Sequence, residues 1–166
     1  MAAVREVSEI TFHDLYEAYP DFHLDVAREQ QQLLEHDVVI LQHPFYWYSA
    51  PALLKEWLDL VLEYGFAYGP GGTRLHGKTL VSALTTGGAA QGYGRGGHNH
   101  FTIAELLTPF EQTARLCGMK WLSPFVVYGT IRLTDETEIS RHATAYTQFV
   151  TALRDGRPTT ERAGGT

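Results

Sequence analysis

Short apolar runs alternate with longer segments of helical spacing along the chain. The runs at 38–42 and 79–84 are typical of buried strands, covered on both faces. The stretch from Val4 to Phe12 is rich in β-favouring residues and predicts an earlier strand, and 121–128 predicts a last one. Pro124 is expected at a strand start or a bulge, because proline cannot donate to the ladder.

Apolar residues recur at helical spacing between these strands. Helices are predicted at 25–35, 53–62, 103–116 and 134–153. The residues expected to cap them at the N-terminus are Asp25, Ser49 and Thr134. Gly65 is expected to end the second helix, because glycine readily adopts the left-handed backbone angles of a helix stop.

Strands separated by helices of about 10–15 residues predict a parallel sheet with helices on both faces, a three-layer α/β fold. Residues 1–153 form one predicted domain, and 154–166 form a predicted flexible tail. Ligands of such sheets bind beyond the carboxyl ends of the strands. Two loops of this sequence are expected there, at 42–49 and 85–100.

The composition describes one ordinary globular domain of 166 residues and 18.6 kDa. Its net charge of −6, without a block of Lys or Arg, argues against a nucleic-acid partner. The single cysteine, Cys117, excludes an intramolecular disulfide, favours a reducing cytoplasm and is predicted to be inert. No apolar run approaches the roughly 20 residues of a membrane helix, and the first six residues lack the apolar region of a signal peptide. We therefore expect a cytoplasmic protein that meets a membrane only through a protein partner.

The first loop contains a proline and four consecutive aromatic residues: Pro44, Phe45, Tyr46, Trp47 and Tyr48. Four adjacent rings cannot all point inward, and exposed aromatic side chains at a strand end suit a flat, partly apolar ligand. The alternative is that Phe45, Trp47 and Tyr48 close the core between sheet and helix. The sequence alone leaves both interpretations open.

The second loop opens with two hydroxyl residues and two glycines: Thr85, Thr86, Gly87 and Gly88. Glycine leaves backbone N–H groups uncovered, so that an anion or the polar edge of a ring can approach closely. Further polar side chains follow at Tyr93, Arg95 and His98. The alternative is a mobile, glycine-rich surface loop. Because both loops lie at the same sheet edge, together they favour a ligand site more than either does alone.

Several motifs, in one order along the chain, carry a resemblance to a known family. They are Asp14-Leu15-Tyr16, Tyr19-Pro20-Asp21-Phe22, Gln42-His43-Pro44, Tyr48-Ser49, Pro51-Ala52-Leu53-Leu54-Lys55-Glu56-Trp57-Leu58-Asp59, Phe66-Ala67, Gly69-Pro70-Gly71-Gly72, Thr85-Thr86-Gly87 and Trp121-Leu122-Ser123-Pro124. On these motifs, from about Val7 to Ala152, the chain resembles the FMN-dependent NAD(P)H:quinone oxidoreductases of the flavodoxin-like fold. Within them it looks closest to the ancillary proteins of glutathione-gated potassium efflux systems. So many ordered matches are specific, although each alone is weak.

The resemblance implies FMN as the cofactor and NADH or NADPH as the hydride donor. Pro44 to Tyr48 would form a wall along the isoalloxazine ring, and Thr85 to Gly88 would hydrogen-bond its pyrimidine end. Tyr93 and His98 match the residues that would stabilise the negative charge of the reduced flavin, with His100 as a rival to His98.

The resemblance also implies a homodimer, in which Tyr68 matches an aromatic residue that covers the flavin of the other subunit. The family begins with a strand and a loop that hold the FMN phosphate. This chain opens at what should be the second strand. The sheet is therefore expected to lack the family's first strand, which is central in the flavodoxin order.

Two functions follow from the resemblance. The first is an enzyme that passes two electrons from NAD(P)H to a quinone or a similar electrophile. The second is a regulatory subunit of a potassium–proton antiporter, with or without turnover, which would place the protein peripherally at the inner membrane through that partner.

Other motifs are interpreted without a special function. His98-Asn99-His100 spells a tripeptide of metal-dependent nucleases, but no acidic or histidine partners flank it, so no metal site is predicted. Gly92 to Gly97 matches a dinucleotide-binding fingerprint only loosely, since no helix follows closely enough. The carboxylates predicted to lie on solvated helix faces are Glu29, Glu35, Glu56 and Asp59.

Overall fold

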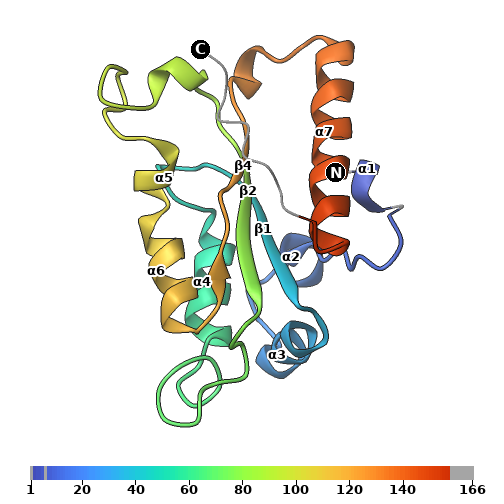
Figure 1. The fold of residues 1–166 in the computed structure, drawn as a ribbon, viewed down its shortest axis with the longest axis vertical. Coiled ribbons are helices and arrows are strands. Elements are labelled where there is room, and N and C mark those ends of the chain that lie inside the picture. The colour runs from blue at the N-terminus through green and yellow to red at the C-terminus, as the bar shows by residue number, and fades with distance from the viewer. Residues whose placement is uncertain (1, 6, 158–166) are drawn as a thin grey trace.

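The computed structural model describes residues 2–5 and 7–157. Its strands are β1 (Val38–Pro44), β2 (Thr79–Thr85), β3 (Lys120–Trp121) and β4 (Phe125–Val127). Its helices are α1 (Ala2–Arg5), α2 (Leu15–Ala18), α3 (Val26–Glu35), α4 (Ala52–Val61), α5 (Ile103–Leu106), α6 (Thr108–Leu116) and α7 (Glu136–Arg154), with the short 3-10 helices η1 (Ala90–Gly92) and η2 (Thr130–Arg132). A sheet with helices on both faces confirms the α/β class (Figure 1).

The strands of the described sheet all run parallel. β1 pairs with β2 along its whole length, from Val38 opposite Thr79 to Pro44 opposite Thr85. The other side of β2 is shared by β3 and β4, which form the predicted last strand with an interruption at Pro124. Because the strands are parallel, their carboxyl ends meet at one edge, toward the top of Figure 1.

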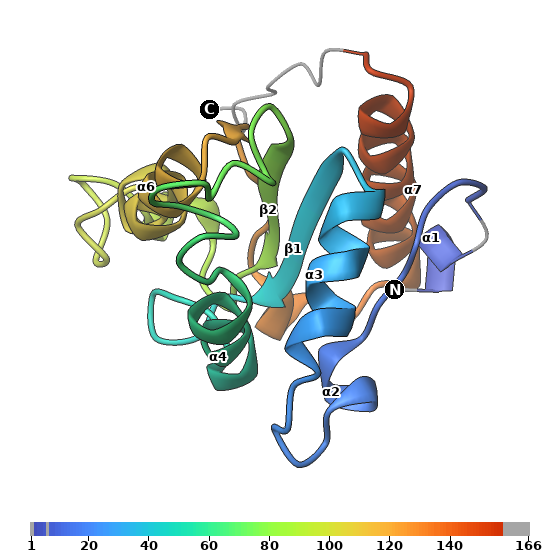
Figure 2. The same cartoon turned by 90° about the horizontal axis from the view of Figure 1, so that it is seen from below.

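Helices α3, α4 and α6 cover one face of the sheet, and α7 covers the other (Figures 1 and 2). The main core joins Leu41 and Leu84 of the sheet to Trp57 of α4 and Phe110 of α6. On the other face, the rings of α7 pack against Phe125 of β4 at centroid distances of 5.1 and 5.2 Å. The order of elements therefore gives three layers, as predicted.

The predicted strand from Val4 to Phe12 is wrong. Residues 2–5 form the helical turn α1, and no described residue before Val38 lies in a strand. β-favouring residues form a strand only beside a partner, and the outer edge of β1 pairs with no described residue. The same unpaired edge leaves residues 38–40 half-buried, whereas both faces of that run were expected to be covered.

The predicted helix ends are only partly confirmed. Asp25 caps α3, and its carboxylate accepts a hydrogen bond from the Arg28 N–H at 3.0 Å. The last helix is capped by Asp135, one residue after the predicted Thr134, because the Asp135 carboxylate accepts from the Thr137 N–H at 2.7 Å. Helix α4 begins after Pro51, although Ser49 was the expected cap. It ends at Val61, before the expected stop at Gly65.

The predicted helix at 103–116 is divided into α5 and α6. Pro109 has no N–H to donate to the Glu105 carbonyl, and it fits the first turn of a new helix. The Thr108 hydroxyl donates to that carbonyl at 2.6 Å instead. The division costs little packing, because Ile103 and Phe110 both remain buried.

Glu29 was predicted to be solvated, and this prediction is wrong: its side chain is 2% exposed. The carboxylate accepts from the Tyr19 hydroxyl at 2.6 Å, the Trp57 indole N–H at 2.8 Å and His13 Nε2 at 2.9 Å. Burial and the Glu29 carboxylate together raise the pKa of Tyr19 to about 12. We call these four residues the Glu29 cluster. It joins the segment before α3 to α3 and α4.

Most of the predicted tail, 154–166, lies outside the described residues. Of its described part, Arg154 ends α7 and Arg157 pairs with Asp155 at 2.6 Å. In the described ranges, no helix is both long and apolar enough to cross a bilayer.

Candidate functional site

The carboxyl ends of β1 and β2 bring the two predicted ligand loops together. Pro44 ends β1 opposite Thr85, which ends β2. The Phe45 N–H donates to the Thr85 carbonyl at 2.8 Å and extends the pairing beyond the strands. We call residues 44–48 the aromatic turn and residues 85–88 the glycine loop. They meet at one edge of the sheet.

The aromatic turn is tight and strained. The Ser49 N–H donates to the Tyr46 carbonyl at 2.9 Å and closes the turn. Trp47 and Tyr48 have φ values of 49° and 62°, in the left-handed region that favours glycine. Such a conformation costs a bulky residue about 1–3 kcal/mol and is concentrated at ligand clamps and switch regions.

The side chains of the aromatic turn divide into two groups. Phe45 is half-buried and packs on the main core, as the core-closing alternative expected. Trp47 is 93% exposed, and Tyr46 and Tyr48 are 59% and 50% exposed. The N–H groups of Trp47 and Tyr48 donate to no atom of the described chain. Exposed rings beside free donors suit a flat ligand with a polar edge.

The glycine loop is anchored to the segment that follows β4. The Gly129 N–H donates to the Gly88 carbonyl at 2.9 Å, and the N–H and hydroxyl of Thr130 donate to the Thr86 carbonyl at 3.0 and 3.1 Å. The Thr86 hydroxyl is buried and donates to the Gly88 carbonyl at 2.7 Å, so Thr86 holds the loop instead of facing a ligand. The N–H groups of Gly87 and Gly88 have no acceptor among the described residues.

Tyr93 lies between the two loops. Its ring centroid is 6.3 Å from that of Phe45 and 5.8 Å from that of Tyr128. A β-carbon added to Gly88 would lie 3.5 Å from the Tyr93 hydroxyl oxygen, so this hydroxyl borders the glycine loop. Burial, with a smaller contribution from Tyr93, raises the pKa of Tyr128 and keeps that phenol protonated.

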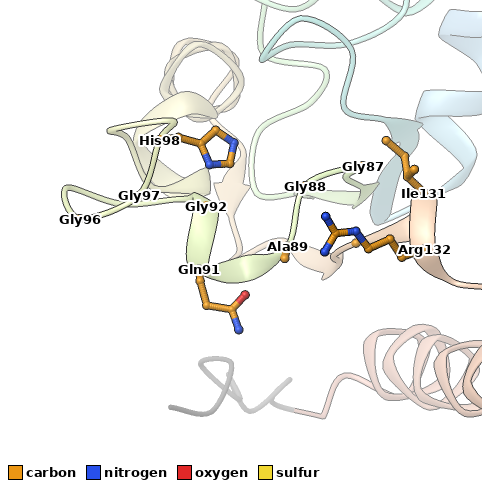
Figure 3. Close-up of a pocket in the computed structure, with 11 residues that line it drawn as sticks. Gly87, Gly88, Ala89, Gln91, Gly92, Gly96, Gly97, His98, Ile131 and Arg132 are labelled. Atoms are coloured by element: carbon orange, nitrogen blue, oxygen red, sulfur yellow. The ribbon is translucent and has the colours of Figure 1, made fainter.

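His98 lines a cavity of about 530 Å³ together with Gly87 and Gly88 (Figure 3). Its exposed imidazole lies against Gly92, where an added β-carbon would meet the ring at 2.7 Å. The rival His100 does not line this cavity, which favours His98 of the two. Beside His98, Asn99 accepts a hydrogen bond from the Tyr48 hydroxyl at 3.1 Å, linking this loop to the aromatic turn.

Comparison with known proteins identifies the family. The sequence model of Flavodoxin_2, described as a flavodoxin-like fold, matches residues 1–150. The chain belongs to this flavodoxin-like family. It is 51% identical over 142 residues to the glutathione-regulated potassium-efflux system ancillary protein KefG of Serratia proteamaculans, covering 86% of this chain and 77% of that protein.

Two solved flavodoxin-like structures are similar over most of their length. General stress protein 14 of Treponema denticola, in complex with FMN, has a TM-score of 0.87 and 38% identity, over 92% of this chain and 87% of that one. An NADPH-quinone reductase from P. pentosaceus has a TM-score of 0.81 and 37% identity, over 89% and 84%. Among the residues that the structure describes, no three His, Cys, Asp or Glu side chains are grouped so that they could hold a metal ion.

Tyr68 is not brought to this site. The loop that carries it joins the end of α4 to the start of β2, at the opposite end of the flavodoxin-like sheet (Figure 1). Its ring packs edge to face on Tyr64 at 5.8 Å. Within one chain Tyr68 does not reach the carboxyl edge, so its predicted role requires a second subunit.

His43, directly before the aromatic turn, was not singled out from the sequence. It is buried and stacks on Phe110 at a centroid distance of 5.7 Å. Its Nδ1 lies 3.0 Å from the Pro44 carbonyl, and its Nε2 has no partner in the part of the chain that the structure describes. Burial lowers the pKa of His43 below its usual value of 6.5, so the ring is neutral at pH 7.

Proposed function

We propose that this protein is an FMN-dependent NAD(P)H:quinone oxidoreductase. The observation that carries the proposal is the meeting of the aromatic turn and the glycine loop at the carboxyl edge of a parallel sheet, where such sheets bind ligands. The FMN complex of the T. denticola relative and the NADPH-quinone reductase of P. pentosaceus support it.

The residues at this edge fit a flavin. The exposed ring of Trp47 and the free N–H groups of the aromatic turn suit one side and edge of an isoalloxazine. The free N–H groups of Gly87 and Gly88 suit the carbonyl oxygens of its pyrimidine end. Bound FMN would supply the transfer of two electrons between NAD(P)H and a quinone or similar electrophile.

We assign Tyr93 and His98 the role of donors to the electron-rich end of that ring. The Tyr93 hydroxyl borders the glycine loop and has no acceptor among the described residues. The Phe45 and Tyr128 rings on either side hold it in place. A donor fixed in advance stabilises developing negative charge without reorganisation, which is the source of its effect on rate. The proposal includes a homodimer, in which Tyr68 of one subunit covers the site of the other.

FMN titration and steady-state turnover test this function. We expect a saturable visible flavin spectrum with the purified protein, followed by oxidation of NADH or NADPH that depends on an added quinone. A protein that takes up no FMN, and shows no turnover when FMN is added, contradicts the proposal.

A second candidate function is regulation of a potassium–proton antiporter by a cytoplasmic protein bound at the inner membrane. The 51% identity to the KefG ancillary protein favours it. Deleting the gene should weaken potassium efflux after an electrophile is added. Complementation with a Tyr93→Phe/His98→Gln double variant then separates the roles: restored efflux without turnover indicates a binding subunit, and lost efflux indicates that catalysis is needed. An unchanged efflux in the deletion strain excludes this function.

A further inference from the structure

The cavity beside the glycine loop has a lining suited to an anion. It lies between the glycine loop, the loop that carries His98, and η2 (Figure 3). Six of its eleven lining residues are glycines, so backbone groups are open to close approach. The charged or chargeable side chains among the lining residues are Arg132 and His98, and no carboxylate lines the cavity.

Arg132 is the cation of this cavity. Its side chain is exposed, forms no ion pair with any described residue, and is directed from η2 toward Ala89 (Figure 3). The backbone beneath it is fixed, because the Arg132 N–H donates to the Gly129 carbonyl at 2.9 Å and Gly129 is bonded to the glycine loop. An unpaired guanidinium on a fixed backbone beside open glycines matches the shape and charge of a phosphate.

We propose that this cavity binds a phosphate of the nicotinamide dinucleotide donor and that Arg132 is its main contact. The inference rests on the proposed function, which places the flavin against the same glycine loop. A nicotinamide stacked on that flavin carries its phosphates beyond the ring, and the cavity opens directly next to Gly87 and Gly88. Arg132 is then a binding residue for the hydride donor and has no contact with the quinone.

Ile131 lines the cavity next to Arg132. It is 81% exposed, and its Cδ1 would lie 2.7 Å from a β-carbon added to Gly87. The Ile131 side chain therefore lies against Gly87, at the edge of the cavity.

Equilibrium binding of 2′,5′-ADP, which cannot transfer hydride, tests the site without turnover. At fixed ionic strength we expect Arg132→Gln to weaken binding about 10- to 100-fold, the range for loss of a charge-assisted hydrogen bond. Arg28→Gln is the matched control, because Arg28 is exposed on α3, forms no ion pair in the described chain and does not line the cavity. Its affinity should stay within twofold of wild type. ADP, which has a diphosphate but no 2′-phosphate, is a second probe. If Arg132 contacts the 2′-phosphate, the effect of Arg132→Gln disappears with ADP; if it contacts the diphosphate, the effect remains.

Steady-state kinetics gives the second readout. Arg132→Gln should raise KM for NADPH about 10-fold or more and leave KM for the quinone unchanged. Equal affinity of wild type and Arg132→Gln, equal loss in both arginine variants, or no binding of 2′,5′-ADP to wild type would overturn the site. Binding that depends on Arg132 in a protein without turnover would leave the site standing and remove the proposed function. Normal turnover with no effect of Arg132→Gln would support the proposed function and overturn the phosphate site.

Discussion

The Glu29 cluster and the carboxyl edge of the sheet use polar groups in opposite ways. In the Glu29 cluster, the carboxylate is buried and both oxygens are hydrogen-bonded, with partners from the segment before α3 and from α4. At the carboxyl edge, the N–H groups of Trp47, Tyr48, Gly87 and Gly88 have no acceptor in the described chain, and two bulky residues adopt left-handed backbone angles.

The difference separates what holds the fold from what serves a ligand. Buried polar groups stabilise a fold only when their bonds are complete, as they are around Glu29. Donors that face solvent remain available to a ligand, whereas backbone strain costs stability and persists where the surrounding structure fixes it. At the carboxyl edge, the pairing of β1 with β2 and the bonds from Gly129 and Thr130 provide that support.

The largest expected effect is on the Glu29 cluster. Glu29→Ala leaves the Tyr19 hydroxyl and the Trp57 indole N–H buried without an acceptor, and each such group costs about 1–3 kcal/mol. We expect the free energy of unfolding to fall by about 3 kcal/mol in a urea titration. Glu35→Ala, an exposed position at the end of the same helix, should change it by less than about 0.5 kcal/mol. Equal effects of the two variants would mean that the cluster contributes nothing special.

Sequence patterns predicted the regular parts of this fold for a physical reason. β2 is recognisable as a continuous apolar run that is buried on both faces, and α3 is recognisable because burial of its inner face repeats with the helical period. The burial of Glu29 could not be predicted from this pattern, because its hydrogen-bond partners Tyr19 and Trp57 lie outside its helix. The β-favouring run at 4–12 fails similarly, since a strand depends on a neighbour that no periodicity reveals.

The candidate site was only partly predictable. Placing both loops at one edge followed from parallel strands alone, and the register of Pro44 with Thr85 agrees with it. The sequence did not reveal that Thr86 is engaged inside the loop, that Trp47 and Tyr48 are strained, or that Arg132 and Gly87 line one cavity. Each of these depends on how separate loops close against one another, which residue types alone do not determine.

His43 sharpens the comparison, because it is buried like Glu29 but its Nε2 lacks a partner among the described residues. Its pKa is lowered in the folded state, so acid protonates the unfolded chain first, and stability is lost as pH falls below about 6.5. We expect His43→Gln to flatten the pH dependence of the unfolding free energy between pH 6.5 and 5, by at most about 1.4 kcal/mol per pH unit. Identical slopes for wild type and variant would show that His43 does not titrate on unfolding.

Trp47 tests whether strain at the carboxyl edge serves a ligand. Trp47→Gly relieves a positive φ and removes an almost fully exposed ring, so stability should rise by about 1 kcal/mol while FMN affinity falls about tenfold. Trp47→Ala is the control, because it removes the ring but keeps the strain: affinity should fall equally without the gain in stability. Unchanged FMN affinity in both variants would remove Trp47 from the proposed wall.

The smallest expected effect concerns Tyr93, whose hydroxyl is the side-chain counterpart of the free N–H groups at the carboxyl edge. Tyr93→Phe keeps the packing on Phe45 and Tyr128 and removes one donor beside Gly88, so hydride transfer measured by stopped flow should slow about fivefold at unchanged FMN affinity. Tyr128→Phe removes a hydroxyl from the neighbouring ring and should change the rate by less than about twofold. If the two variants slow transfer equally, the effect comes from ring packing and not from a donor. The Tyr93 side chain would then contribute to the fold, as the Glu29 cluster does, and its hydroxyl would have no role in the reaction.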